Sequence, residues 1–347
     1  RGIFNREAAR KGIERNTENR TKNDRPRETN HNFGTNPCSE IVLRDCEFCN
    51  LTEMVVRADD TPESLRRKAR LATILGTWQS TLTDFRYLSS AWKKNCEDER
   101  LLGVSMTGIM DSDLTNGNTD GLEEMLADLR DDVVKTNREY AKNLGIEQSV
   151  STTCAKPSGT VSQLVDAASG IHARHNPHYI RTVRADNKDP LCQFMKDQGF
   201  PAEACVMKPD NVTVFSFPVK APENSVFRTD MTAIEQLELW LKYQKFWCEH
   251  KPSVTITVKE NEWFEVGAWV WNNLDNISGI SFLPHSDHTY KQAPYQDCNV
   301  EEYEELLEKL PNDIDWTLLK NYEQEDNTAG SQTMACSGDS CEVVDLS

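Results

Sequence analysis

The sequence has no long hydrophobic run, because no stretch approaches the roughly 18–20 apolar residues that a membrane-spanning helix needs. It is also short of basic residues, with 39 Lys and Arg against 56 Asp and Glu, so its formal net charge is −17. A surface of this charge repels phosphate backbones and anionic lipid headgroups. We therefore expect no nucleic-acid partner, no membrane association, and a soluble protein located in the cytoplasm.

The sequence also lacks a secretory pattern at its N-terminus, although it contains 11 cysteines. In a reducing compartment such thiols are mostly free, and a functional pair is redox-active or metal-binding. Residues 1–35 are expected to be a polar lead-in, and the opening thirty residues contain little that could form a core. The sequence begins without Met, so we expect a piece of a longer protein. The polar, acidic residues 323–347 predict a mobile tail.

Helical patterns alternate with short strand patterns over most of the chain. This alternation predicts an α/β architecture with largely parallel strand pairing. The expected strands are 149–154, 179–184, 212–217, 254–258 and 277–283. The expected helices are one from Asp60 onward, capped by Thr61 and Pro62, then 120–143, 161–168, 190–198, 233–247, 263–273 and 301–310.

The most informative local segment is Asn36-Pro37-Cys38-Ser39-Glu40. Pro37 biases Asn36 toward an extended conformation, which is typical of a loop that presents its side chains. Alternate residues of an extended segment project the same way, so the Cys38 thiol and the Glu40 carboxylate would face one substrate. On these residues alone, a cysteine that only packs in the interior is the more common explanation.

A second local pattern is Lys156-Pro157-Ser158-Gly159-Thr160-Val161, between a predicted strand and a predicted helix. Free N–H groups and the helix dipole at such a helix start favour an anion, and Lys156 adds positive charge. An ordinary helix cap would explain this turn as well. His172, His175 and His178 follow at spacings that suit a metal, but no acidic cluster matches them, and we interpret them as a polar loop.

Several segments, in the same order, resemble the ribonucleotide reductases. Residues 36–51 are similar to the finger loop of that family, residues 101–109 to a further family segment, and residues 169–172 continue the likeness after the phosphate-binding turn. The resemblance implies that residues 36–322 form the second half of a ten-stranded α/β barrel, with the central finger loop at its start and a flexible, redox-active C-terminal tail over residues 323–347. It also implies reduction of ribonucleotides to 2′-deoxyribonucleotides by thiyl-radical chemistry.

The resemblance assigns a role to each residue of the finger loop. Cys38 becomes the thiyl radical that removes the 3′ hydrogen of the ribose, and Glu40 accepts the proton of the 3′ hydroxyl as general base. Asn36 and Ser39 bind the substrate. Cys49 supplies one of two reducing equivalents, and no cysteine of this chain matches the family partner of Cys49.

The same resemblance assigns the turn after the strand to the substrate phosphates. The residues implied in phosphate binding are Pro157, Ser158, Gly159, Thr160 and Val161.

Two further cysteines, Cys336 and Cys341, lie in the predicted mobile tail, and a glycine lies between them. They are similar to the tail pair that regenerates the active-site dithiol in the family, with a thioredoxin-like or other dithiol as the reductant. An alternative is a zinc site that joins this pair to Cys46 and Cys49, which have Cys-x-x-Cys spacing. The finger-loop resemblance already uses Cys49, which argues against zinc, and we expect no metal ligands.

The kind of reductase follows from motifs that the sequence lacks. It has no pair of adjacent tyrosines, which the oxygen-dependent kind uses to relay its radical, and no glycyl-radical motif of the anaerobic kind. The remaining kind depends on adenosylcobalamin. Residues 72–83 and 284–290 are most similar to its monomeric branch, which reduces ribonucleoside triphosphates.

The leading hypothesis is therefore a half-barrel that becomes active with the missing N-terminal half of the enzyme. Two alternatives stay open. One is a thiol–disulfide oxidoreductase that uses the tail cysteines, and the other is a non-catalytic fragment that binds a partner chain or a nucleotide.

Overall fold

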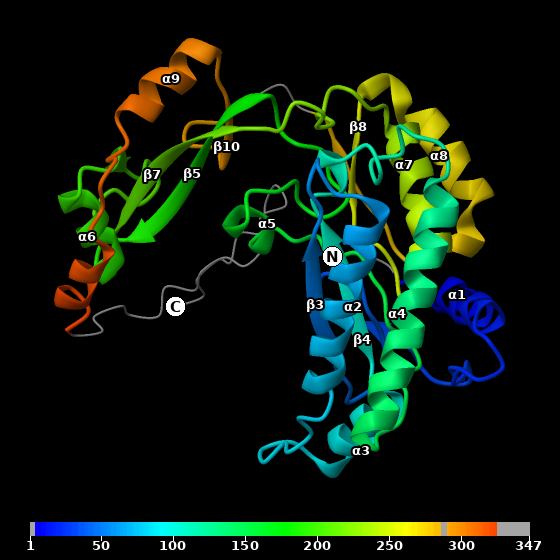
Figure 1. The fold of residues 1–347 in the computed structure, drawn as a ribbon. Coiled ribbons are helices and arrows are strands. Elements are labelled where there is room, and N and C mark those ends of the chain that lie inside the picture. Colours follow the sequence, from blue (N-terminus) through cyan, green and yellow to red (C-terminus); the bar gives the residue numbers. More distant parts are fainter. Residues whose placement is uncertain (1–3, 286–289, 325–347) are drawn as a thin grey trace. The chain divides into compact units, whose positions relative to one another are not determined.

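The structure, a computed structural model, describes residues 4–285 and 290–324 (Figure 1). The chain divides into two compact units, the first formed by Arg1–Ala173 and Asn224–His285 and the second by Arg174–Glu223 and Ser286–Ser347. The boundaries of these two units differ from the domain boundaries that the sequence predicts after residues 35 and 322. Those boundaries separate expected roles along the chain, and they stay predictions.

The first unit is built on parallel strands. Its strands are β1 (Gly34–Thr35), β2 (Val42–Leu43), β3 (Asn50–Val55), β4 (Leu102–Thr107), β8 (Thr255–Val258) and β9 (Ser281–Pro284). β3 pairs in parallel with β4, and β8 pairs in parallel with β9, whereas β1 and β2 form a short antiparallel pair. Two isolated parallel bridges, Val104 to Thr153 and Ala155 to Pro252, connect β4 with the segment that leads into β8. The expected α/β class is confirmed, and so is parallel pairing within this unit.

Helices of the first unit begin and end largely where local signals place them. They are α1 (Arg6–Asn19), α2 (Pro62–Gln79), α3 (Ser90–Glu99), α4 (Leu122–Leu144), α5 (Val161–Leu164), α7 (Ala233–Lys242) and α8 (Trp263–Asn272). Thr61 caps α2 by accepting a hydrogen bond from the Ser64 N–H, with Pro62 in the first turn. Gly145 ends α4 in the left-handed conformation, with φ of 69°. α7 continues as a π-helical turn, Tyr243–Trp247, so the expected helix 233–247 is confirmed with a change of pitch.

The main core lies between the strands and the pair α2 and α4, which run alongside β3 and β4 in Figure 1. Met54, Val104 and Met106 project from the strands toward Leu65, Ala69, Leu126 and Val133 of the helices. α2 approaches closely at Gly76, where a Cβ would lie 2.3 Å from Leu102 Cδ2. Because side chains alternate along a strand, the residues between these core positions face away from α2 and α4.

The opening segment is more ordered than its composition indicates. Asn5 caps α1, and Ala9 and Ile13 of this helix pack with Phe33 and Val42 in a small buried cluster. The expectation that the opening thirty residues contribute little to a core is therefore wrong. The polar composition is misleading because Arg20 and Arg27 are themselves buried in ion pairs with Glu249 and Glu99.

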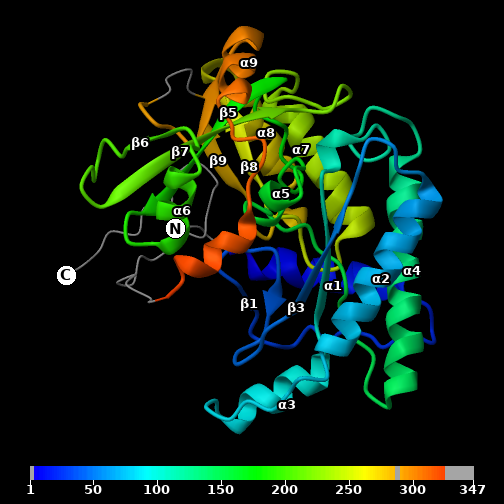
Figure 2. The same ribbon diagram turned by 60° about the vertical axis from the view of Figure 1, so that its left-hand side comes forward.

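The second unit is antiparallel. Its sheet has the order β10 (Tyr295–Asp297), β5 (His178–Asp186), β7 (Val212–Lys220) and β6 (Ala202–Ala204), and every pairing in it is antiparallel. Figure 2 shows β5 and β7 side by side, with α9 (Val300–Glu308) next to them. α6 (Pro190–Asp197) contributes Phe194, whose ring packs against Trp316 and Tyr322. The expectation of largely parallel pairing is wrong here, because the pattern within one strand does not encode the direction of its neighbour.

Three other elements differ from expectation. The expected strand 149–154 forms isolated bridges and hydrogen bonds without a full ladder, and the expected strand 277–283 is ordered as β9 only from Ser281. The expected helix 161–168 ends at Leu164. Within the part of the chain that the structure describes, no helix is both long and apolar enough to cross a membrane.

Candidate functional site

The face of the parallel strands that points away from α2 and α4 carries polar side chains. Glu53 of β3 and Ser105 of β4 are register partners on this face. Ser105 Oγ accepts a hydrogen bond of 2.9 Å from the Lys156 N–H, and Lys156 Nζ lies 3.0 Å from Glu53 Oε2. The Lys156 charge, which the sequence assigned to an anion site, is therefore compensated by Glu53.

The Cys38 loop, defined as residues 36–41, contacts the segment that enters β8. Ser253 Oγ donates a hydrogen bond of 2.6 Å to the Cys38 carbonyl, and Lys251 Nζ donates one of 3.0 Å to Ser39 Oγ. On the strand side, a Cβ added at Gly103 would lie 3.1 Å from Ile41 Cδ1. The loop therefore lies against β4 and against residues 251–253.

The Cys38 loop is a tight turn. The Asn36 carbonyl accepts the Ser39 N–H at 2.9 Å, and Asn36 Oδ1 accepts the Ile41 N–H at 3.1 Å. Ser39 has φ of 67°, in the left-handed region. The fully extended conformation expected for this segment is therefore wrong at Ser39, so strand alternation does not relate Cys38 to Glu40. The Asn36 side chain closes the turn with its oxygen, which leaves its NH₂ group for other contacts.

Glu40 is buried without full hydrogen bonding. It is 3 % exposed, and its Oε2 atom has no hydrogen-bond partner among the described residues. Its carbonyl accepts the Lys251 N–H at 3.2 Å. Burial lowers the pKa of Lys251 to about 8, although the negative charge of Glu40 acts to raise it. A carboxylate and an ammonium thus share one buried environment.

Cys49 is a neutral, half-buried thiol beside this loop. Burial raises its pKa well above the ordinary cysteine value, and the charges of Glu40 and Glu47 add to this effect. A Cβ at Gly103 would lie 3.1 Å from Cys49 Sγ. Cys154 is fully buried, and after burial the proximity of Cys49 contributes most to its raised pKa.

The segment 249–253, Glu-His-Lys-Pro-Ser, positions the loop, and sequence reasoning missed it. His250 Nε2 donates to the Leu102 carbonyl at 3.0 Å, while its Nδ1 accepts the Val42 N–H at 3.4 Å. Burial lowers the pKa of His250 well below the ordinary histidine value, so the ring is neutral. The available signal was a run of polar residues directly before an apolar strand.

A cluster of buried charged side chains anchors the part of the chain that follows the Cys38 loop. Arg27 Nη2 lies 2.7 Å from Glu99 Oε2 and donates to the Val42 carbonyl at 2.9 Å. Arg44 Nε lies 3.6 Å from both Glu47 and Glu99. Burial, together with the neighbouring Glu99 charge, raises the pKa of Glu47 to about 8.

Ser253 links the Cys38 loop to Ala155, in the segment that leads into the turn at residues 157–161. Its N–H donates to the Ala155 carbonyl at 2.8 Å, and its hydroxyl holds the Cys38 carbonyl. Ala155 directly precedes Lys156 and this turn. Ser253 therefore connects the Cys38 loop to the residues that directly precede the turn.

The turn itself offers polar groups to a ligand. Ser158 has φ of 55°, and its buried Oγ has no hydrogen-bond partner among the described residues. Within the same residues, the N–H groups of Thr160 and Val161 donate no hydrogen bond. Because α5 has only four residues, its dipole is weaker than the expected helix 161–168 would supply.

The histidines do not converge. His172 uses both ring nitrogens in the first unit, donating to the Ser169 carbonyl and accepting the Thr255 N–H, each at 3.0 Å. His175 and His178 belong to the second unit, where His175 pairs with Asp297 at 2.7 Å. Over residues 4–285 and 290–324, no group of three or more His, Cys, Asp or Glu side chains is placed to hold a metal. Cys336 and Cys341 lie outside the described residues.

Comparison with known proteins identifies relatives of this chain. No family model matches the chain. It is 30 % identical over 287 residues to the adenosylcobalamin-dependent ribonucleoside-triphosphate reductase of Euglena gracilis, which covers 81 % of this chain and 38 % of that protein. It is 29 % identical over 340 residues to the enzyme of the same name from Lactobacillus delbrueckii subsp. bulgaricus, covering 89 % and 45 %. The chain thus spans less than half the length of these relatives.

Solved structures of ribonucleotide reductases also match this chain. A crystal structure of a B12-dependent class II ribonucleotide reductase matches with a TM-score of 0.68 and 26 % identity, covering 83 % of this chain and 43 % of the other. The α subunit of the class Id ribonucleotide reductase of Actinobacillus ureae matches with a TM-score of 0.50 at 15 % identity over 82 % of this chain and 58 % of the other, which is a likeness of fold alone.

Proposed function

We propose, from the homology of this chain to the adenosylcobalamin-dependent ribonucleoside-triphosphate reductases, that it takes part in reducing ribonucleoside triphosphates to 2′-deoxyribonucleotides. The chain would form the second half of a ten-stranded barrel whose first half comes from elsewhere. The observation that carries the proposal is the link through Ser253, which joins the Cys38 loop to the strand end before the turn at 157–161. A thiol and a phosphate-binding turn that are linked in this way suit a substrate with a sugar and phosphates.

Cys38 and Glu40 would perform the chemistry on the ribose. A thiyl radical at Cys38 takes the 3′ hydrogen atom, forms an S–H bond and leaves a substrate radical. Glu40 takes the proton of the 3′ hydroxyl as general base, which assists loss of the 2′ hydroxyl as water. The burial of Glu40 and its unpartnered Oε2 support this role, because a desolvated carboxylate with a free oxygen is ready to accept a proton.

Asn36, Ser39 and the turn 157–161 would bind the substrate. The Asn36 NH₂ group and the Ser39 hydroxyl hydrogen remain available after their internal hydrogen bonds. The N–H groups of Thr160 and Val161, with the Ser158 hydroxyl, would bind the phosphates.

Cys49 would supply one of the two electrons that the reduction consumes. Its raised pKa keeps it as a thiol, which is the form that donates hydrogen. Cys336 and Cys341 would then restore the reduced state by disulfide exchange, with a thioredoxin-like or other dithiol as the final reductant.

Adenosylcobalamin is the cofactor that this homology implies. A site for this cofactor needs a reachable thiol and surroundings that exclude water. It does not need a group of metal-ligating side chains, because the cobalt ligands are part of the cofactor. Cys38 is partly buried on its loop beside the buried Glu40, which fits the first demand. When bound, the cofactor supplies an organic radical by homolysis of its cobalt–carbon bond. Cys38 would face it, and we assign no residue to the corrin ring.

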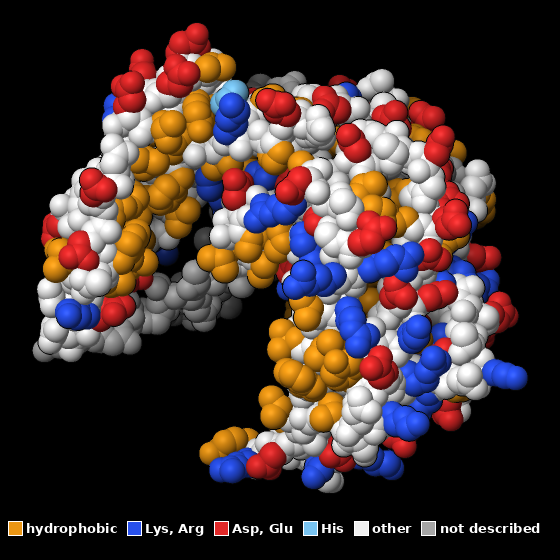
Figure 3. All heavy atoms as spheres, in the orientation of Figure 1, with side chains coloured by type: hydrophobic (Ala, Val, Ile, Leu, Met, Phe, Trp, Pro, Cys, Tyr) orange, Lys and Arg blue, Asp and Glu red, His pale blue; other side chains and the backbone are white. Residues whose placement is uncertain are grey.

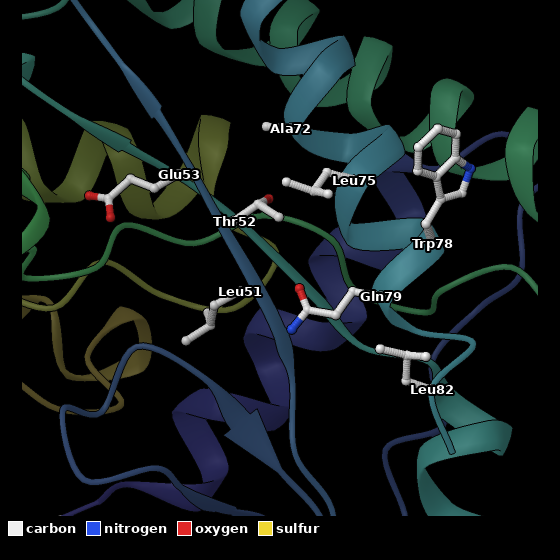
Figure 4. A pocket seen from close by; sticks show the side chains of 8 residues that line it. All are labelled: Leu51, Thr52, Glu53, Ala72, Leu75, Trp78, Gln79 and Leu82. Carbon is white, nitrogen blue, oxygen red and sulfur yellow. The ribbon is translucent and has the colours of Figure 1, made fainter. Parts of the chain in front are cut away.

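A docking surface for the first half-barrel would lie at β3 and α2. Within the described residues, β3 pairs only with β4, so its other edge is open. A pocket of about 530 Å³ lies between this strand and α2, and Figure 4 shows Leu75 and Gln79 pointing toward it. Leu75, Trp78 and Leu82 are 58 %, 53 % and 70 % exposed. Figure 3 shows hydrophobic side chains gathered on this part of the first unit.

This surface suits a strand and a helix of another polypeptide. An open strand edge offers a row of unpaired N–H and C=O groups, and a large apolar patch beside it gains free energy when covered. The proposed occupant is the part of the relatives that this chain does not span, because the chain covers only 38–45 % of their length.

The docking proposal is tested by measuring binding of that first half-barrel, taken from a relative, by calorimetry. The double change Leu75→Ser and Leu82→Ser should weaken binding at least about tenfold, because it removes roughly 1.4 kcal/mol or more of apolar contact. Phe264→Ser, which changes an exposed aromatic residue of α8, is the matched control and should bind as the starting chain does. Equal affinity of all three chains would contradict the proposal, and so would binding of a second copy instead.

The function is tested by combining this chain with the first half-barrel, adenosylcobalamin, a ribonucleoside triphosphate and a dithiol. Deoxynucleotide should form, Cys38→Ser should abolish it, and Cys298→Ser should leave it unchanged. Disulfide turnover that survives Cys38→Ser without any nucleotide product would favour a thiol–disulfide oxidoreductase instead.

A further inference from the structure

Lys251 is the least expected group near the Cys38 loop. It is 2 % exposed, which is rare for a lysine because burying an ammonium without compensation is costly. Its Nζ donates to Ser39 Oγ at 3.0 Å, and its backbone N–H donates to the Glu40 carbonyl at 3.2 Å. One residue thus holds two consecutive residues of the loop, one through its side chain and one through its backbone.

The charges around Lys251 are few. Glu40 is the carboxylate whose negative charge acts on it, and burial is the larger, opposing influence. Cys248 is the other titratable neighbour, and it is a neutral thiol because burial raises its pKa well above the ordinary cysteine value. Glu40 in turn acts on the half-buried thiol of Cys49 and on the buried thiol of Cys154. Among these neighbours, Lys251 is the group able to balance the Glu40 carboxylate. Among the described residues the two side chains form no direct ion pair, and the ammonium donates a hydrogen bond of 3.0 Å to Ser39 Oγ.

We propose that Lys251 is a positioning residue that fixes Ser39 in its left-handed turn and supplies the positive charge that keeps Glu40 ionised. This inference rests on the proposed function only where it calls Glu40 the general base. A buried carboxylate without a nearby cation takes up a proton, and a protonated carboxyl cannot accept another. Lys251 would thereby keep Glu40 in the form that can accept the 3′-hydroxyl proton.

The charge coupling can be measured on the chain without turnover. With lysine labelled at ¹³Cε, the NMR signal lost in Lys251→Met identifies Lys251, and its shift with pH gives its pKa. Glu40→Gln should lower that pKa from about 8 by about one pH unit, because a neighbouring negative charge is removed. Glu53→Gln, which removes the carboxylate that pairs with Lys156, is the matched control and should leave the Lys251 titration in place.

Coupling is reciprocal, so Glu40 must respond to Lys251. The infrared band of a protonated carboxyl, assigned by its loss in Glu40→Gln, should appear at neutral pH in Lys251→Met and in Lys251→Gln. Lys251→Gln keeps a donor for Ser39 and so separates the charge from the hydrogen bond. Lys251→Arg should suppress the band again, and the distant control Lys68→Met should not produce it.

Two results would overturn the inference. One is a Lys251 titration that does not move in Glu40→Gln, which needs no change at Lys251 and so stands even if the Lys251 variants fold poorly. The other is an unchanged Glu40 band in well-folded Lys251→Met. In the reconstituted enzyme, Lys251→Met should lower kcat by at least about 100-fold with little change in KM, and Lys251→Arg should restore part of it.

The outcomes also separate this inference from the proposed function. Loss of the coupling with intact ribonucleotide reduction rejects only the role of Lys251. Intact coupling in a reconstituted system that forms no deoxynucleotide rejects the proposed function.

Discussion

Arg20 and Glu249 form a two-point ion pair in the interior, with Arg20 Nε 2.7 Å from Glu249 Oε1 and Arg20 Nη2 2.7 Å from Glu249 Oε2. Their side chains are 4 % and 1 % exposed. Glu249 Oε2 also accepts the N–H and the hydroxyl of Thr152, each at 2.8 Å. Burial alone would raise the pKa of Glu249, but the charge and hydrogen bonds of Arg20 lower it below the ordinary value. The pair therefore fixes the end of α1 to two neighbouring parallel segments.

Breaking this pair should be costly. Arg20→Met leaves a buried carboxylate without its cation, and we expect the free energy of unfolding of the first unit to fall by about 3–5 kcal/mol. Arg66→Met, which breaks exposed pairs with Asp128 and Asp132, is the matched control and should cost no more than about 1 kcal/mol. Urea unfolding followed by tryptophan fluorescence measures both, and equal losses would contradict the prediction.

Gly170 should tolerate no side chain. It has φ of 55°, and an added Cβ would lie 2.3 Å from the Lys156 carbonyl oxygen, directly before the turn at 157–161. Gly170→Ala should therefore displace the turn and weaken nucleotide binding in the reconstituted enzyme. Gly145→Ala has a similar φ of 69° but open space around the new Cβ, so it should cost only about 1 kcal/mol of stability and leave nucleotide affinity unchanged. Equal nucleotide affinity of the two variants would show that the turn does not bind the substrate.

Glu47 should make stability depend on pH. Its pKa in the folded chain is about 8 against an ordinary value of 4.5, so the folded state holds this proton more tightly than the unfolded state. The contribution is fully present below pH 4.5 and is lost as the pH rises to about 8. Glu47→Gln should remove this part of the slope, which is roughly 3–4 kcal/mol between pH 5 and 8. Unfolding curves at a series of pH values test it, and an unchanged slope would mean that Arg27 and Arg44 keep Glu47 ionised.

Capping and turn residues in the sequence predicted the parts of the fold that depend only on neighbouring residues. The start of α2 follows from Thr61 and Pro62, and the end of α4 follows from Gly145, because capping involves only residues within one turn. The two segments at Cys38 and at 157–161 were likewise found from their own residue types. Their link through Ser253 required the fold, since Ser253 is distant from Cys38 in sequence.

Contacts between residues that are distant in the sequence were not predicted. Arg20 and Arg27 belong to a segment that looked too polar for a core, yet each is buried beside a glutamate far along the chain. No local pattern reports such a pair, because either residue alone would be placed at the surface. Lys251 was missed for the same reason, and the antiparallel order of β5 and β7 depends on connections that a strand pattern does not contain.

The open edge of β3 also bears on how the isolated chain behaves in solution. An unprotected strand edge beside exposed leucines can template the pairing of any extended polypeptide, including another molecule of the same kind. Concentrated samples should therefore aggregate unless the first half-barrel is present from the moment of synthesis. Because this edge is open in the isolated chain, we expect co-expression of the two polypeptides to give less aggregation than refolding them separately and then mixing them.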